Sequence, residues 1–163
     1  MLLQNDDGAN QSITWQIPLS RMLDVVEADI PNEWIRALRA VSHDLRFQRH
    51  GREIALTDLV WNLALGSDDS VAIGMYSTTG SISSFLVNNG TYTLSAPEGT
   101  CTVWVAETVQ DSFGRYEFIQ WPSTGLMPAT PQVVAGEAVW IEPDGHILAR
   151  IGELQPADNH ETN

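Results

Sequence analysis

The sequence predicts an α+β fold in which N-terminal helices pack on an antiparallel β-sheet of about seven strands, arranged as a sandwich or a partial barrel. Three observations support this prediction. Apolar residues recur at helical spacing in residues 12–66, they alternate with polar residues in residues 67–151, and short turns rich in Gly, Asn and Pro separate the alternating segments. The 163 residues suit a single domain, with a polar arm over residues 1–11 and a polar tail over residues 152–163.

A first strand and a short helix open the predicted domain. Residues 12–17 alternate, with apolar side chains on one side of the strand: Ile13, Trp15 and Ile17. A proline follows, and residues 20–28 then predict a short helix with Leu23 and Val26 facing inward.

The second predicted helix begins near Asp29–Pro31, where a carboxylate and an early proline suit a helix N-terminus, and ends near Gly51. At about 100° per residue it carries one narrow apolar face: Trp34, Leu38, Val41 and Leu45. A third helix is predicted over residues 57–66.

The strands of the β-rich part are predicted from alternation and turn residues. Residues 70–76 and 81–87 read as strands, and Asn89-Gly90 predicts a tight hairpin that returns over residues 91–95. Residues 101–109, a turn at 110–114 and residues 115–121 form the next predicted hairpin, followed by a loop at Pro128 and Pro131. Pro143-Asp144-Gly145 predicts the turn of a last hairpin formed by residues 138–142 and 146–151.

Composition restricts the classes of function. The net charge of −13 opposes binding of nucleic acid or anionic lipid through the whole surface, and no apolar stretch approaches the length of a membrane span. The N-terminal residues lack the pattern of a signal peptide, so we expect a cytoplasmic protein, or one in an assembly formed there. Nucleic acid and membranes are therefore not expected partners.

The sequence lacks the common catalytic motifs, which favours a non-enzymatic protein; an active site without a local motif is compatible with this absence. The sequence contains no phosphate-binding glycine loop, nucleophile elbow or zinc-binding His-Glu-x-x-His helix, so no cofactor or metal site is predicted. The single cysteine, Cys101, alternates with valines, and we interpret it as a small core residue. Trp104 has the opposite parity on the same predicted strand, so it faces a second buried layer, a partner or a ligand.

The most distinctive feature of the sequence is a cluster of basic residues, which we call the basic ridge. Five of the eight arginines fall within residues 36–52, opposed there only by Asp44, whereas residues 54–163 hold two arginines against thirteen acids. On the predicted helix, basic side chains recur every three or four residues opposite the apolar face: Arg36, Arg39, His43, Arg46 and His50, with Arg49 nearby.

This ridge has three interpretations. In the first, the ridge is a charged helix face exposed to solvent. In the second, it pairs with the acidic β-rich region, within one chain or between copies. In the third, it binds a polyanion. Pairing between copies would use different surfaces on each and would build rings or filaments.

The sequence therefore favours a non-enzymatic protein-interaction protein, which includes a self-assembling subunit of a larger phage-type or accessory complex. The predicted partner-binding residues are Arg36, Arg39, His43, Arg46, Arg49, His50 and Trp104. One alternative is an acidic inhibitor or immunity protein that blocks a basic partner, including by DNA mimicry. Another is a small enzyme or carbohydrate-binding module on the β-rich region, which would need a concave pocket with convergent polar groups or exposed aromatic rings.

Overall fold

The computed structural model describes residues 13–24 and 29–157. The elements follow in the order β1 (Ile13–Pro18), η1 (Leu19–Arg21), α1 (Asn32–Asp44), η2 (Leu56–Asp58), β2 (Leu59–Leu65), β3 (Val71–Ser77), β4 (Phe85–Val87), α2 (Glu98–Ser112), η3 (Phe113–Glu117), β5 (Thr130–Val134), β6 (Glu137–Ile141) and β7 (Ile147–Arg150). The predicted polar arm and the last part of the predicted polar tail lie outside the described residues.

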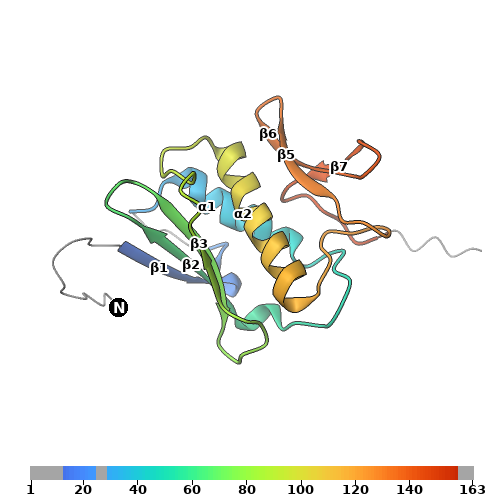
Figure 1. Ribbon diagram of the computed structural model, residues 1–163, viewed down its shortest axis with the longest axis horizontal. Helices are drawn as coiled ribbons and strands as arrows, with labels where there is room; N and C mark the ends of the chain where they lie inside the picture. The colour runs from blue at the N-terminus through green and yellow to red at the C-terminus, as the bar shows by residue number, and fades with distance from the viewer. Residues whose placement is uncertain (1–12, 25–28, 158–163) are drawn as a thin grey trace, which may run out of the picture.

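The seven strands form two antiparallel sheets on either side of the helices. Strands β1 to β4 follow one another in a four-stranded sheet, and β5 to β7 form a three-stranded sheet. Figure 1 shows α1 and α2 side by side between the two sheets, with the four-stranded sheet on the left and the three-stranded sheet at the upper right. The predicted α+β class, with helices packed on antiparallel strands, is confirmed.

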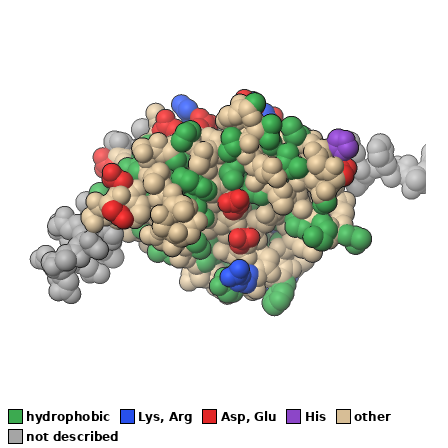
Figure 2. Space-filling view, turned by 45° about the horizontal axis from the view of Figure 1, so that its top comes forward, with side chains coloured by type: hydrophobic (Ala, Val, Ile, Leu, Met, Phe, Trp, Pro, Cys, Tyr) green, Lys and Arg blue, Asp and Glu red, His purple; other side chains and the backbone are tan. Residues whose placement is uncertain are grey.

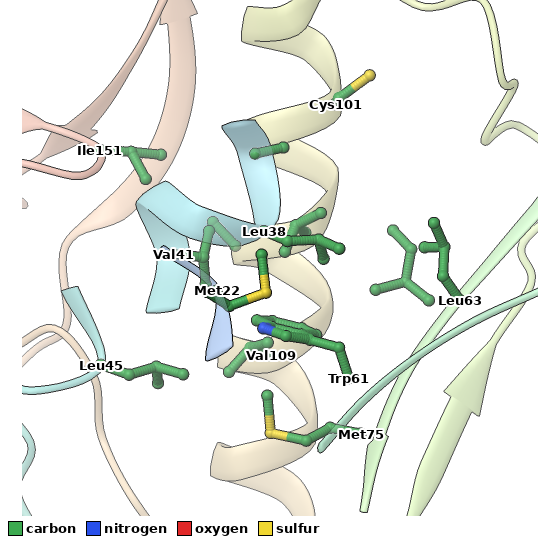
Figure 3. Packing of buried hydrophobic residues seen from close by; sticks show 14 of the residues in the cluster. Met22, Leu38, Val41, Leu45, Trp61, Leu63, Met75, Cys101, Val109 and Ile151 are labelled. Carbon is green, nitrogen blue, oxygen red and sulfur yellow. The ribbon is translucent and has the colours of Figure 1, made fainter. Parts of the chain in front are cut away.

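The apolar stripe of the main helix lies at the centre of the core, as predicted. Its four members are completely buried: Trp34, Leu38, Val41 and Leu45. Figure 3 shows Leu38 and Val41 of α1 close to Trp61 of β2 and Val109 of α2, so both helices and the four-stranded sheet share one core. Burying each aliphatic side chain of this kind contributes about 1.5–3 kcal/mol to folding.

Helix α1 begins after Pro31, as predicted, but ends at Asp44 and does not continue to Gly51. Beyond Asp44 the backbone tightens, with Phe47 N donating to Asp44 O at 3.0 Å, and Gln48 takes a left-handed φ of 57°. The Asp44 carbonyl at this end also accepts a hydrogen bond from Trp121 Nε1 at 3.1 Å, and the fully buried Asp44 side chain binds the C-terminal part of the chain, as described below.

Two predicted helices are wrong. Only the short 3₁₀ turn η1 forms in the described part of residues 20–28; Leu23 is 75% exposed, and Val26 lies outside the described residues. Residues 57–66 form most of η2 and strand β2. Their apolar residues alternate as well as they fit a helix, and β2 pairs with β3 along its whole length and with β1 over residues 60–65.

The predicted strand at residues 101–109 is helix α2. Its buried residues Cys101, Val105 and Val109 are four apart, and Phe113 continues the series, so the same residues satisfy a helical period. Pro97, immediately before the helix, suits such a start. The predicted turn at 110–114 and strand at 115–121 are likewise wrong, since α2 continues into the π-helix η3.

The predicted Asn-Gly hairpin is also wrong. Strand β4 pairs with β3 at Ile73 to Met75, and the following segment stays on the same edge of β3, with Val71 N donating to Tyr92 O at 2.9 Å. Residues 88–91 therefore form a loop within one continuing edge. The loop predicted at the two prolines contains β5, which pairs with β6, whereas β1, β3 and the β6–β7 hairpin form where predicted.

Candidate functional site

The predicted basic ridge is shorter in the structure, because α1 ends at Asp44. Its three helical members each have a partner within the chain. Arg36 Nη1 lies 2.9 Å from Glu98 Oε2 at the start of α2, and Arg39 Nε donates to Met22 O at 3.0 Å. His43 Nδ1 lies 2.9 Å from Asp44 Oδ1.

Arg46 and Arg49 lie beyond the end of the helix. Arg46 is exposed, and Arg49 donates from its guanidinium to Leu45 O and lies 3.8 Å from the Glu53 carboxylate. Burial lowers the pKa of Arg49, and the charge of Glu53 acts in the opposite direction. The predicted ridge therefore does not form one continuous face, and binding of a partner by these residues stays a prediction.

Trp104 packs against the core from one side of α2. Its ring lies 6.2 Å from that of Trp34 and 5.1 Å from that of Tyr92, measured between centroids, and it is partly buried. The parity argument for Trp104 is wrong, because residues 101–109 are helical and alternation does not assign their faces.

Asp44 joins α1 to the C-terminal part of the chain. Its Oδ2 accepts hydrogen bonds from Trp140 Nε1 at 2.8 Å and from Gly152 N at 2.7 Å. Its Oδ1 accepts one from Leu154 N at 3.0 Å and contacts His43 Nδ1. A buried carboxylate with this many donors is a structural anchor.

The segment between η3 and β5 is held in place along its backbone. We call residues 118–127 the connector. His50 exchanges backbone hydrogen bonds with Gln120 at 2.9 and 2.8 Å, and its Nε2 lies 2.6 Å from Ser123 O. Ser123 N donates to Gln48 O at 3.0 Å, so the connector is bound to the segment that follows α1.

Helix α2 and the core hold the connector from the other side. Gln110 Nε2 donates to Trp121 O at 2.9 Å and to Ala129 O at 2.6 Å. The Trp121 indole is buried, donates to Asp44 O at 3.1 Å, and stacks edge-on against Trp140 with centroids 5.0 Å apart. The connector is therefore an ordered part of the fold.

Three large apolar side chains of this ordered segment nevertheless face solvent. Phe118 is 83% exposed, Leu126 93% and Met127 63%. Figure 2 shows one face of the molecule, where hydrophobic side chains reach the surface in several places beside a few acidic and basic ones. Apolar side chains that lie together on a surface mark sites that bind other molecules, and Leu126 and Met127 are neighbours in the chain.

Charges of both signs lie beside the connector. The four arginines are Arg46, Arg49, Arg52 and Arg115, and the three carboxylates are Glu53, Glu117 and Glu142. Glu142 Oε1 accepts a hydrogen bond from Thr124 Oγ1 of the connector at 3.1 Å. Glu117 is buried, pairs with Arg52, and accepts a hydrogen bond from Ser83 N at 2.6 Å. Arg115 forms no ion pair within residues 13–24 and 29–157. We call the exposed apolar side chains of the connector and these arginines the connector surface.

Sequence reasoning missed the connector. A signal was present, because Leu126 and Met127 stand next to Gly125 in a segment bounded by Pro122 and Pro128, where turn-forming residues predict exposure. The hydrogen bonds that order this segment join residues about 70 positions apart, such as His50 and Gln120, and local patterns do not reveal them.

A pocket of about 420 Å³ lies at the other end of α1. Its walls are fixed, because Trp34 Nε1 donates to Leu94 O and Leu94 N donates to Asp69 O, both at 3.0 Å. Four lining residues are apolar and two are acidic, and we call it the acid-rimmed pocket: Pro31, Glu33, Asp69, Leu94, Ser95, Ala96 and Pro97.

A second hollow, of about 440 Å³, crosses the face of the four-stranded sheet that the helices leave uncovered. One row across the strands contains Gln16, Asn62, Gly74 and Leu86. A side chain at Gly74 would not fit in this row, because its Cβ would stand 2.2 Å from Phe85 O. The buried Oδ1 atom of Asn62 has no hydrogen-bond partner. The lining is neutral, so this groove can hold a small neutral donor but offers no acid or base.

Within the described residues, no group of three or more His, Cys, Asp or Glu side chains is placed to hold a metal ion. None of the described helices is long and apolar enough to cross a lipid bilayer. In comparisons with protein-family models, curated proteins and solved structures, the chain matched none.

Proposed function

We propose that this protein is a non-enzymatic protein-interaction protein that binds a protein partner through the connector surface. One observation carries the proposal: Phe118, Leu126 and Met127 are largely exposed on a backbone that hydrogen bonds hold from two sides.

The physical argument concerns what binding costs and returns. Covering a large apolar side chain contributes about 1.5–3 kcal/mol. A segment that is already ordered loses little conformational entropy when a partner covers it, so more of this contribution remains as affinity. Aromatic residues, Met and Arg are enriched in protein–protein interfaces, whose apolar centre is surrounded by a polar rim.

The charge beside the connector indicates the chemistry of the partner. Four arginines against three carboxylates give this region a small positive balance, on a chain whose net charge is −13, and beside Phe118 the Arg115 side chain is exposed and forms no ion pair within the described residues. A partner that presents an apolar centre with acidic residues around it would be complementary.

The side chains with the most familiar catalytic chemistry serve the fold, which supports a non-enzymatic role. The His50 ring holds the connector, the His43 ring contacts the buried Asp44 carboxylate, and Cys101 Sγ donates to Ala96 O at 3.3 Å.

The test is photocrosslinking in cells that produce the protein. A photoreactive phenylalanine analogue replaces Phe118 in one variant and the similarly exposed Ile147, on β7, in a matched control. We expect a defined protein adduct from position 118, and its loss when Leu126→Ser and Met127→Ser are added. Equal adducts from both positions, or no adduct from position 118, would contradict the proposal.

A further inference from the structure

We infer that the partner of the connector surface is a second copy of this chain, and that Phe118 of one copy enters the acid-rimmed pocket of the next. This inference rests on the proposed function and deepens it by naming the occupant. Its evidence is the complementarity of two surfaces described independently above.

The two surfaces lie at opposite ends of the same helix. Pro31 and Glu33, at the start of α1, line the acid-rimmed pocket, whereas the connector is bound to the segment that follows the end of α1. The 13 residues of α1 separate these ends by about 20 Å. A contact that joins different surfaces of two copies is heterologous, so it repeats from copy to copy and builds a ring or a filament.

The chemistry of the two surfaces matches. The pocket offers apolar walls from Leu94, Ala96 and two prolines, and its volume of about 420 Å³ is that of a ligand-sized hollow that accommodates an aromatic side chain. Phe118 is apolar and 83% exposed, and its backbone is left-handed, with φ of 55°, directly after the end of η3. One surface therefore presents an apolar projection, and the other presents an apolar cavity.

The charges also match, and they are unpaired in the single chain. Glu33 and Asp69 line the pocket, and neither forms an ion pair within the described residues. Arg115, three positions before Phe118, is exposed and likewise unpaired there. Docking would bring this guanidinium towards the two carboxylates. Because the net charge of −13 repels two copies elsewhere, the exposed Arg115 beside Phe118 marks where the acidic rim of a second copy can approach.

The experiment uses two complementary variants of the full chain. The first, Phe118→Ser with Arg115→Glu, has a defective connector surface and an intact pocket. The second, Glu33→Arg with Asp69→Arg, has a defective pocket and an intact connector surface. Circular dichroism checks that each is folded, and light scattering behind a sizing column measures molar mass over a range of concentrations.

We expect the natural chain, and the control variant Ile147→Ser, to exceed the 18.0 kDa monomer mass increasingly with concentration. Each defective variant alone should remain monomeric, with self-association weakened at least about tenfold. An equimolar mixture should form a one-to-one dimer and nothing larger, because only one good contact remains. Combining Arg115→Glu with Glu33→Arg and Asp69→Arg in one chain should restore association by exchanging the charges.

Three outcomes of the molar-mass measurement would overturn the inference: a natural chain that stays monomeric throughout, single variants that associate as the natural chain does, or a mixture that stays monomeric although the natural chain associates. A monomeric natural chain that still gives a crosslinked adduct of a different protein from position 118 overturns the head-to-tail contact alone. No adduct from position 118 in a natural chain that associates would place the contact elsewhere and overturn both proposals.

Discussion

Cys101 illustrates how burial sets the chemistry of one residue. The thiol is fully buried in the contact between α2 and the core, and Sγ donates to Ala96 O. Burial, assisted by the nearby charges of Glu33 and Glu98, raises the pKa of the Cys101 thiol to about 12. At pH 8 only about one thiol in ten thousand is then ionised, and the thiolate is the reactive form.

We therefore predict that Cys101 resists thiol reagents in the folded protein. Mixing with a chromogenic disulfide at pH 8 should give labelling that proceeds no faster than unfolding, whereas the guanidinium-unfolded chain should react within minutes. Complete labelling of the native protein on the time scale of the unfolded chain would show that the thiol is accessible and would contradict the assigned burial.

For Cys101, the sequence predicted burial correctly but predicted the wrong secondary structure. Cys101 was expected in the core and lies there, although on a helix and not on a strand. The spacing of Cys101, Val105 and Val109 fits both periods, so it identifies what is buried and leaves the backbone open. For Leu23 the predicted burial was wrong. It was expected to face inward from a helix that does not form in the described residues, and its side chain is exposed.

At the scale of elements, the Asp44 carboxylate connects α1 to the C-terminal hairpin. The variant Asp44→Ala would leave Trp140 Nε1, Gly152 N and Leu154 N buried or partly buried without their acceptor. Each such donor costs about 1–3 kcal/mol, so we predict a loss of at least about 3 kcal/mol in the free energy of unfolding. Urea denaturation measures this loss.

A matched control distinguishes the buried hydrogen bonds of Asp44 from its contact with the partly exposed His43 ring. The variant His43→Ala removes only the partly exposed partner of the carboxylate and keeps the three other donors satisfied, so its loss should be much smaller. Hydrogen exchange of Asp44→Ala should show early opening of β6 and β7 relative to the four-stranded sheet. Equal stability of both variants would mean that the hairpin does not depend on this carboxylate.

Several elements could not be predicted because their partners are distant in sequence. Strand β2 has apolar residues at Leu59, Val60 and Leu63, which suit a helix as well as a strand, and its pairing with β1 and β3 decides the outcome. The buried Asp44 carboxylate at the end of α1 has its donors more than 95 positions away, such as Trp140. By contrast, the β6–β7 hairpin was predictable, because its turn residues lie between its two strands.

At the scale of the whole molecule, the charge is unevenly distributed. The sequence predicted a basic region on residues 36–52 and an acidic remainder, and the structure divides the predicted ridge into a helical part paired within the chain and a part that adjoins the connector. What could not be predicted is the apolar component, since the connector and the acid-rimmed pocket each combine segments that are far apart in the sequence.

The head-to-tail contact has a definite dependence on salt, because two electrostatic terms of opposite sign act over different distances. Repulsion between copies of net charge −13 acts across the whole surface, and at about 0.1 M salt, where the Debye length is about 10 Å, most of it is already screened. Attraction between Arg115 and the carboxylates of Glu33 and Asp69 acts at contact distance, and it is substantially screened only near 1 M, where the Debye length is about 3 Å.

We therefore predict that the weight-average mass at fixed protein concentration falls as sodium chloride rises from about 0.1 to 1 M. The variant Arg115→Gln, which keeps Phe118 but removes the charge, should show a lower mass at 0.1 M and little further change with salt. A mass that rises steadily with salt in both proteins would indicate that apolar burial and relief of repulsion drive association, and that the acidic rim does not select the connector surface.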